Sequence, residues 1–291
     1  MANVVSFSEF ENERDIEAYQ SGLPRIVLEG VDDLRLFRTY WFPHLIDRFQ
    51  FIEANEIVGG GGCTAVIAAV EASKQDNIPA FGFVDRDRLF RVKEWATLFD
   101  VDASAFTTAA SNNDFYTTLR WEVEAYLLEP DLLSAWLRSF CQPPARPEQS
   151  ASAVARAVYE CEQLLKAHRY FATAHHCGVP VGDEHFLDRP ISQLLSACDE
   201  ALRRLNHDGT VAAAVDSYVD IIMKAAPADP GPRLVWLLQY VDTKRLLVRL
   251  TTRWRGNGDI RWFLAECMHQ SNTRPQEIER KLLEVYDTLA A

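Results

Sequence analysis

The chain has 291 residues, of which 48% are hydrophobic and 25% charged. This balance is typical of a soluble globular protein with one large domain or two ordinary ones. The formal net charge of −12 disfavours a protein that coats nucleic acid, although a carboxylate-lined metal site would itself add negative charge. No uncharged apolar run reaches the roughly 18 residues that a membrane span needs, so no membrane association is expected.

Cysteine usage and the first residues both favour a cytoplasmic location. The six cysteines are scattered without a CxxC pair, which favours reduced thiols over a disulfide framework. The segment MANVVSFSEFENERD (1–15) turns acidic at once and lacks the basic-then-apolar order of a signal peptide.

The first half of the chain alternates strand-like and helix-like segments. We expect strands over 25–30, 49–58 and 78–85, because each is a short apolar run that ends at Gly or charged residues. Helical spacing follows residue 30 until Pro43 interrupts it, and 63–76 predicts a second helix with Thr64 as its N-cap. The GGGG run (59–62) lacks the Lys of a phosphate-binding P-loop and predicts a tight strand-to-helix turn.

The second half is helical almost throughout. The Pro-rich segment 141–152 predicts a linker, and helical patterns cover 152–176, 190–206, 210–226, 232–252, 260–269 and 275–290. We therefore expect an α/β domain with a mostly parallel sheet over 1–142 and an all-α domain over 143–291.

Carboxylates follow two of the predicted strands. Glu29 comes after the first, and Asp85 and Asp87 come after the third. Residues beyond the carboxyl ends of parallel strands converge in one crevice, and alternation along an extended chain would point Asp85 and Asp87 the same way. Converging carboxylates repel unless a cation joins them, and Mg²⁺ or Mn²⁺ takes such oxygen ligands. The alternative is an exposed turn in which Asp and Arg charges neutralise one another.

Three short motifs resemble a known family. IVLEGVDD (26–33), GFVDRD (82–87) and EAYLL (124–128) resemble the TOPRIM domain of topoisomerases, bacterial primases and OLD-family nucleases. The resemblance extends over roughly 24–130 and is nearest to small TOPRIM nucleases that are encoded beside an ABC/OLD-like ATPase. These include the toxin effector of the PARIS anti-phage system. Ala125 replaces an Asn of the family pattern, so any hydrogen bond of that Asn is absent here.

The resemblance implies roles for matching residues. Glu29 would be a general base or metal ligand, Asp33 a second ligand, and Asp85 and Asp87 the holders of one or two metal ions. Glu124 would be a further site carboxylate. Glu122 is either another such carboxylate or part of an exposed face.

A basic segment lies late in this acidic chain. Arg245, Arg249 and Arg253 are spaced by four residues and would form one helical stripe for nucleic acid, with Trp254 as a stacking platform. The alternative is a solvated helix face paired with acidic neighbours. Lys244 is a candidate for steadying charge at the metal site, as a Lys does in related nucleases.

The function expected from this resemblance is a metal-dependent TOPRIM endonuclease. Its substrate would be RNA, such as tRNA, and an ABC/OLD-like ATPase would restrain it as a toxin effector of anti-phage defence. The alternatives are a DNA endonuclease of the OLD type, a non-catalytic docking or sensor module, and a phosphohydrolase of small molecules. A homodimer is left open.

Overall fold

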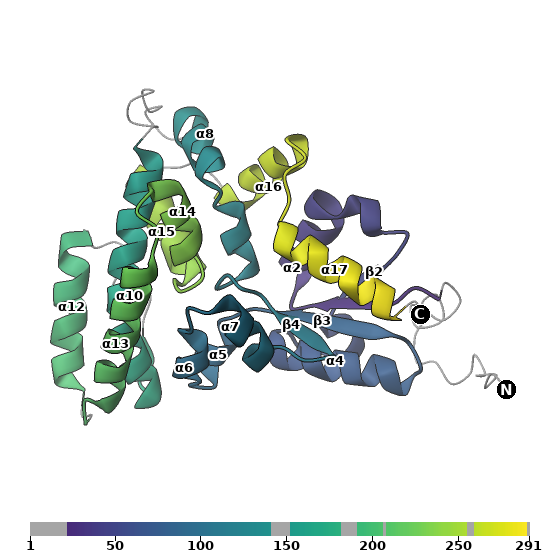
Figure 1. The fold of residues 1–291 in the computed structure, drawn as a ribbon, viewed down its shortest axis with the longest axis horizontal. Helices are drawn as coiled ribbons and strands as arrows, with labels where there is room; N and C mark the ends of the chain where they lie inside the picture. The colour runs from purple at the N-terminus through teal and green to yellow at the C-terminus, as the bar shows by residue number, and fades with distance from the viewer. Residues whose placement is uncertain (1–21, 141–151, 182–190, 206–207, 255–258, 290–291) are drawn as a thin grey trace. The chain divides into compact units, whose positions relative to one another are not determined.

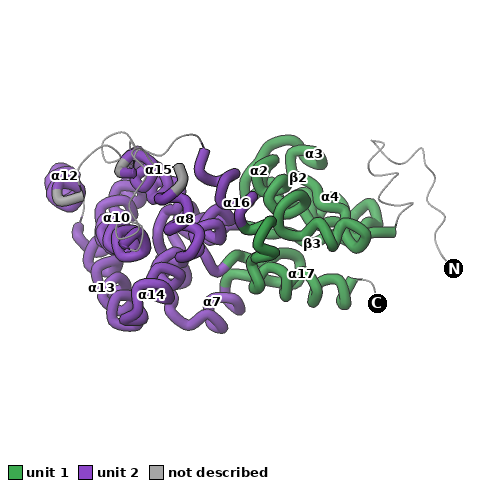
Figure 2. The backbone as a smooth tube through the Cα atoms, turned by 90° about the horizontal axis from the view of Figure 1, so that it is seen from above, with its two compact units in different colours: residues 1–84, 110–118, 268–291 green, residues 85–109, 119–267 purple. Residues whose placement is uncertain are grey.

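The protein consists of two compact units, each assembled from distant parts of the chain (Figure 2). The computed structural model describes residues 22–140, 152–181, 191–205, 208–254 and 259–289. Unit 1 comprises 1–84, 110–118 and 268–291, and unit 2 comprises 85–109 and 119–267. The domain boundary predicted at 142–143, in the expected linker, lies outside the described residues and stays a prediction.

Unit 1 is built on a four-stranded sheet in which every neighbouring pair is parallel (Figure 1). The order is β2-β1-β3-β4, with β1 at Arg25–Leu28, β2 at Gln50–Glu53, β3 at Ala80–Val84 and β4 at Phe115–Thr117. The predicted α/β architecture with a parallel sheet is therefore confirmed. The sequence did not predict β4.

One face of this sheet is aliphatic and packs on helix α4 (Cys63–Gln75). Val27, Ile52 and Val84 point to this face, and Val66 of α4 is fully buried against them. Gly82 lets the helix approach, since a Cβ built there would lie 2.6 Å from Val66 Cγ1. The glycine of the FGFVD segment is thus required by packing.

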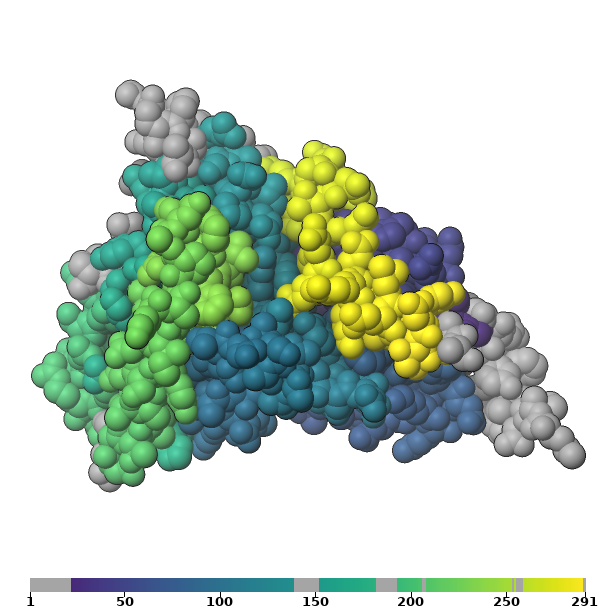
Figure 3. Space-filling view, viewed as in Figure 1, coloured from purple at the N-terminus to yellow at the C-terminus, as the bar shows by residue number. Residues whose placement is uncertain are grey.

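The opposite face is aromatic. Phe37, Phe81 and Tyr116 surround Phe83 with edge-to-face or tilted ring contacts, the ring centroids lying 5.5–5.9 Å from that of Phe83. Helix α17 (Gln276–Leu289) borders this face, since the Tyr116 hydroxyl donates to Glu277 Oε1 at 2.7 Å. In the space-filling view α17, in yellow, lies beside the purple segment that follows β1 (Figure 3).

Three local predictions in unit 1 were wrong. The strand predicted over 49–58 ends at Glu53, and 55–58 form a short helix, α3 (Asn55–Val58). The glycine run therefore joins two helices, with positive φ at Gly59, Gly60 and Gly62. Thr64 does not cap α4, whose N-cap is Gly62. The helix after β1, α2 (Val31–Arg35), continues as a π-helix (Leu36–Trp41) and ends before Pro43, as predicted.

Unit 2 is helical in its described part, which confirms the predicted helical portion in this coarser form. Its central helix is α10 (Ala153–His176), against which α12, α13, α14, α15 and α8 pack (Figure 1). The other helices are α5 (Arg88–Arg91), α6 (Trp95–Leu98), α7 (Ala103–Ala110), η4 (Val123–Leu127), α8 (Pro130–Phe140), α12 (Ile191–Arg204), α13 (Thr210–Ala225), α14 (Pro230–Leu237), α15 (Thr243–Trp254) and α16 (Ile260–Gln270).

The single helix predicted over 232–252 is two helices. Helix α14 ends at Leu237 and α15 begins at Thr243, so the intervening turn presents Asp242 at the start of α15. Over the described ranges, no helix combines the length and the apolar character required to cross a membrane.

Candidate acidic site

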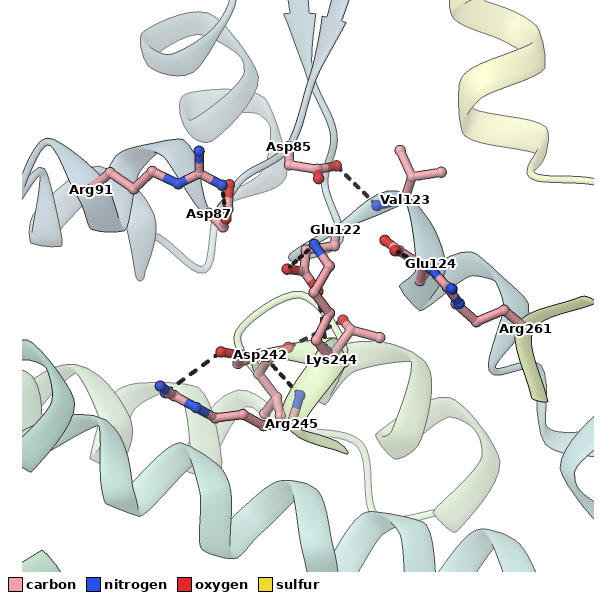
Figure 4. A network of polar contacts seen from close by, with 12 residues as sticks. Asp85, Asp87, Arg91, Glu122, Val123, Glu124, Asp242, Lys244, Arg245 and Arg261 are labelled. Carbon is pink, nitrogen blue, oxygen red and sulfur yellow. Dashed lines mark hydrogen bonds and ion pairs between the residues drawn. The ribbon is translucent and has the colours of Figure 1, made fainter. Parts of the chain in front are cut away.

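The Asp85-Arg86-Asp87 segment is a turn rather than a continuation of β3. The N–H of Arg88 donates to the Asp85 carbonyl at 3.3 Å, and α5 starts directly after Asp87. Asp85 is 5% exposed, and its Oδ1 accepts a 2.9 Å hydrogen bond from the Val123 N–H. The extended alternation expected for Asp85 and Asp87 is therefore wrong, and the two carboxylates meet different partners (Figure 4).

Arg86 fastens this turn to the rest of unit 2. Its side chain is 1% exposed, and it donates to the carbonyls of Leu98 at 2.6 and 2.9 Å and of Leu119 at 2.9 Å. The guanidinium also lies 3.9 Å from the Phe106 ring centroid and 4.7 Å from that of Tyr240. Burial lowers the pKa of Arg86 to about 10, so the group stays charged at neutral pH. Arg86 therefore positions the two aspartates on either side of it.

Asp87 is fixed through both its backbone and its side chain. Its N–H donates to the Trp121 carbonyl at 3.1 Å, and its Oδ2 pairs with Arg91 Nη2 at 2.6 Å. Its Oδ1 is buried and has no hydrogen-bond partner in the described part of the chain. Burying an acceptor without a partner costs free energy, so this oxygen is one that a ligand could satisfy.

Two further carboxylates meet at the start of α15. Asp242 caps the helix, because its Oδ1 accepts the Arg245 N–H at 2.9 Å. Glu122 is 3% exposed, and its two oxygens accept the Lys244 N–H at 3.2 Å and the Lys244 ammonium at 3.0 Å. Both side chains therefore have a structural role, because they accept N–H groups of the first turn of α15.

Glu124 completes the group. It lies in the 3₁₀ turn Val123–Leu127, is 5% exposed, and pairs with Arg261 Nη1 at 3.5 Å. We call Asp85, Asp87, Glu122, Glu124 and Asp242 the acidic cluster; all five belong to unit 2 (Figure 4).

The surroundings of Glu122 in the acidic cluster favour its protonated form. Burial raises the pKa of Glu122 to about 8, and the negative charges of Asp242, Glu124 and Asp87 add to this while Lys244 opposes it. For Lys244, burial favours the neutral amine, but Glu122 and Glu124 outweigh it and raise the pKa above its usual value. Neighbouring carboxylates contribute to both shifts, and a bound cation would offset their charge.

The donor chemistry of the cluster suits Mg²⁺ or Mn²⁺, which prefer carboxylate oxygens. The buried Asp87 Oδ1 without a partner is the strongest local sign of such a ligand. However, among the described residues no group of three Asp, Glu, His or Cys side chains is already arranged around one metal position. Asp87 and Glu124 are instead paired with arginines, so a metal ion would have to displace at least the Arg91 contact.

The other predicted ligands lie in unit 1. Asp33 is 9% exposed on α2, and Glu29 directly follows β1 at half-buried exposure. The Glu29 carbonyl accepts from Gly62 N–H at 3.4 Å, and a Cβ at Gly61 would lie 3.3 Å from it. The glycine run therefore packs its backbone against the end of β1.

The basic stripe expected on α15 does not form an open surface. Arg249 is 5% exposed and its Nε donates to Glu160 at 2.7 Å, while Arg245 pairs with Asp242 and lies over the Phe171 ring at 4.2 Å. The Arg253 side chain lies outside the described residues. Arg245 and Arg249 thus hold α15 within unit 2, which corrects the expected nucleic-acid role of this stripe.

Comparisons with known proteins do not assign the chain to a family. No family model, curated protein or solved structure matches the chain. The TOPRIM resemblance therefore rests on its three short motifs.

Sequence reasoning missed several members of this site. Asp242 fell inside a predicted helix, although an Asp three residues before Arg245 is a usual capping arrangement that could have indicated the helix start. Glu122 was given only an alternative role, and Arg91 carried no signal beyond its i,i+4 spacing from Asp87.

Proposed function

We propose that the chain is a metal-dependent phosphodiesterase of TOPRIM type that cleaves nucleic acid. The observation that carries the proposal is the placement of Asp85 directly after β3, an inner strand, in a group of five carboxylates of which Asp85, Glu122 and Glu124 are buried and Asp87 and Asp242 half-buried. In the order β2-β1-β3-β4 the strand order reverses at β1, because β2 is added on one side of β1 and β3 on the other. Ligands of parallel sheets bind beyond the carboxyl ends of the strands at such a switch point, and Glu29 and Asp85 are the residues that follow these two strands.

The buried carboxylates of the acidic cluster also support the proposal energetically. Burying several carboxylates is expensive and is tolerated where they are paired or bind a metal. The partnerless Asp87 Oδ1 supports the proposal, because it leaves one buried acceptor of the cluster for a ligand. The negative charges of Asp242, Glu124 and Asp87 add to the burial that raises the pKa of Glu122, and a bound cation would offset them.

Each residue then has a proposed role. Asp85 and Asp87, both in unit 2, would hold the metal ion. For Asp33 and Glu29, which belong to unit 1, the roles of further ligand and general base are those that the TOPRIM resemblance implies. The bound ion would supply positive charge for the phosphodiester undergoing attack. Lys244 is held by Glu122 while its side chain remains 59% exposed, so its ammonium can meet a phosphate oxygen.

The substrate and partner follow from the resemblance alone. RNA, such as tRNA, is favoured over DNA, and the chain would act as a toxin effector of anti-phage defence that an ABC/OLD-like ATPase restrains.

The test is a cleavage assay on the full chain with end-labelled tRNA, single-stranded RNA and duplex DNA, in Mg²⁺, in Mn²⁺ and in EDTA. We expect cleavage that requires the metal and is abolished by Asp85→Asn and Asp87→Asn. Asp220→Asn, on the exposed surface of α13, is the matched control and should cleave as the wild type does. Full activity of either cluster variant would contradict the proposal.

The pairing of the carboxylates favours one second candidate, a non-catalytic docking module in which the cluster only stabilises unit 2. Thermal unfolding of the same variants in EDTA separates the two. A metal site without its ion is destabilised by like-charge repulsion, so neutralising Asp87 should leave Tm unchanged or raise it. A structural cluster would instead be destabilised by the same change, by about 0.3–0.5 kcal/mol for the loss of the i,i+4 pair with the half-exposed Arg91.

A further inference from the structure

A pocket of about 430 Å³ lies in unit 2, between the first turns of α10 and the last turns of α15. Helix α10 contributes Arg156, Tyr159 and Glu160, whose i, i+3 and i+4 spacing places them on one helix face. Helix α15 contributes Leu250 and Trp254, again one turn apart. The pocket shares no residue with the acidic cluster.

The walls of the pocket are aromatic and aliphatic, and one of them is fixed. Trp254 is 6% exposed, and its ring packs on that of Trp136 with centroids 5.2 Å apart. Leu250 is fully buried beside it. Tyr159 is 48% exposed, an unusual exposure for a large aromatic side chain beside a pocket. Tyr159 and Trp254 thus give the pocket two aromatic surfaces on which a planar ring can pack.

The pocket also contains fixed charge. Glu160 is 4% exposed and is oriented by the Arg249 guanidinium, whose Nε donates to its Oε2 at 2.7 Å. A buried ion pair contributes little net stability compared with apolar packing, so stability alone does not account for the Glu160–Arg249 pair in the pocket wall. A carboxylate fixed in this way is an acceptor for N–H groups of a ligand.

Arg156 supplies the opposite charge. Its side chain is exposed, and no hydrogen bond or ion pair joins its guanidinium to another described residue. Among the described lining residues, Glu160 is paired with Arg249, and Arg156 adds a positive charge. An anionic group on the ligand is therefore favoured on the Arg156 side.

We propose that this pocket binds a single nucleotide whose base carries an amino group, with the base against Tyr159 and Trp254 and the phosphate on Arg156. Aromatic stacking with a neighbouring guanidinium is the usual arrangement for unpaired nucleotides. Glu160 accepts from the amino group of adenine, guanine or cytosine, which uracil lacks. The volume lies near the lower end of the range of about 300–1,000 Å³ for small-molecule sites, which suits one nucleotide rather than a dinucleotide.

The same chemistry could be offered by a free mononucleotide or by one residue of a single-stranded RNA. Calorimetric titration of the full chain in EDTA distinguishes these sources, with AMP, GMP, CMP and UMP in one arm and short oligonucleotides of A or U in the other. Because no cleavage occurs in EDTA, the outcome does not depend on the proposed phosphodiesterase activity.

We expect saturable binding of the amino-bearing nucleotides, either free or within the oligonucleotide. Arg156→Gln should weaken it about tenfold and Tyr159→Ala about fivefold or more, since the first removes a charge-assisted hydrogen bond to the phosphate and the second a stacked ring. Lys166→Gln removes an exposed charge from the same helix and should leave binding unchanged.

Three results would overturn the assignment. If neither arm shows saturable binding, the pocket does not bind a nucleotide. Binding that survives both Arg156→Gln and Tyr159→Ala would place the ligand outside this pocket. Equal affinity for UMP and CMP would refute the role of Glu160.

Discussion

His168 makes unit 2 sensitive to acid. This residue lies in the middle of α10, is 1% exposed, and is surrounded by aromatic rings, including Trp121 at 5.0 Å and Phe99 at 5.7 Å between centroids. The backbone of Tyr240 interacts with the ring and favours its protonation, but neither ring nitrogen forms a hydrogen bond of normal geometry with a described residue. Burial, together with the charge of Arg245, lowers the pKa of His168 from 6.5 to about 3. The folded protein therefore holds this imidazole neutral.

The sign and size of the effect follow from linkage. Between about pH 6.5 and about pH 3 the unfolded chain binds the His168 proton and the folded chain does not, so the free energy of unfolding falls as the pH falls. Each pH unit in this window costs up to about 1.4 kcal/mol from this residue alone. Above pH 6.5 both states are neutral, and His168 contributes no pH dependence.

The substitution His168→Leu isolates the contribution of His168 to the pH dependence of stability, because leucine is apolar and of similar size. We expect the variant to be as stable as the wild type or more stable at pH 7.5, because two buried nitrogens without hydrogen bonds of normal geometry are removed. In urea unfolding from pH 7.5 down to pH 4, the free energy of unfolding of the variant should fall less steeply with pH than that of the wild type, by up to about 1.4 kcal/mol per pH unit. His176→Leu, at the exposed end of the same helix, is the control and should keep the wild-type slope. Identical slopes for wild type and His168→Leu would refute the reasoning.

Three further predictions concern unit 1 packing and the acidic cluster. Gly82→Ala should cost about 1–3 kcal/mol in urea unfolding, because its Cβ would lie 2.6 Å from Val66 Cγ1, and adding Val66→Ala should recover part of the loss; no loss would show that α4 can shift. Arg86→Lys should lower the free energy of unfolding by about 3 kcal/mol, since lysine cannot reach the carbonyls that the guanidinium joins, and an unchanged Tm would contradict this. Glu122, with its pKa raised to about 8, contributes stability that is present below pH 4.5 and lost as the pH rises through 8. Glu122→Gln should flatten that decline, and a decline as steep as in the wild type would show that Lys244 keeps the carboxylate ionised.

The elements that the sequence predicted correctly have strong local patterns. The runs that became β1 and β3 are short, apolar and closed by Gly or Asp, and both strands are buried on both faces. Helix α10 was predicted within one residue at its start because its polar and apolar positions repeat at helical spacing.

The failures occurred where tertiary contacts override a local pattern. Residues 238–242 contain no Pro or Gly, yet the helix breaks there, and the Trp121 N–H donates to the Leu238 carbonyl while the Tyr240 hydroxyl donates to the Asp100 carbonyl. Both partners come from segments more than a hundred residues away in the chain, so no local signal indicates the break.

The same reason explains the errors at the site. The role of Arg86 has no local signal in the sequence, because its carbonyl partners Leu98 and Leu119 are 12 and 33 residues away along the chain. The stripe of Arg245 and Arg249 has the spacing of an exposed helix face, and only the burial of Glu160 on α10 shows that it faces inward. Motif spacing could locate the carboxylates but could not predict which cations pair with them.

Metal-ion rescue at Asp87 tests the central claim most directly. A thiolate ligand prefers softer ions than a carboxylate does, so Asp87→Cys should lose cleavage of labelled RNA in Mg²⁺ and regain part of it in Mn²⁺ or Cd²⁺. Asp220→Cys should behave as the wild type in all three ions. Asp87→Cys activity equal to the wild type in Mg²⁺, or wild-type cleavage that persists in EDTA, would contradict a metal site at the end of β3.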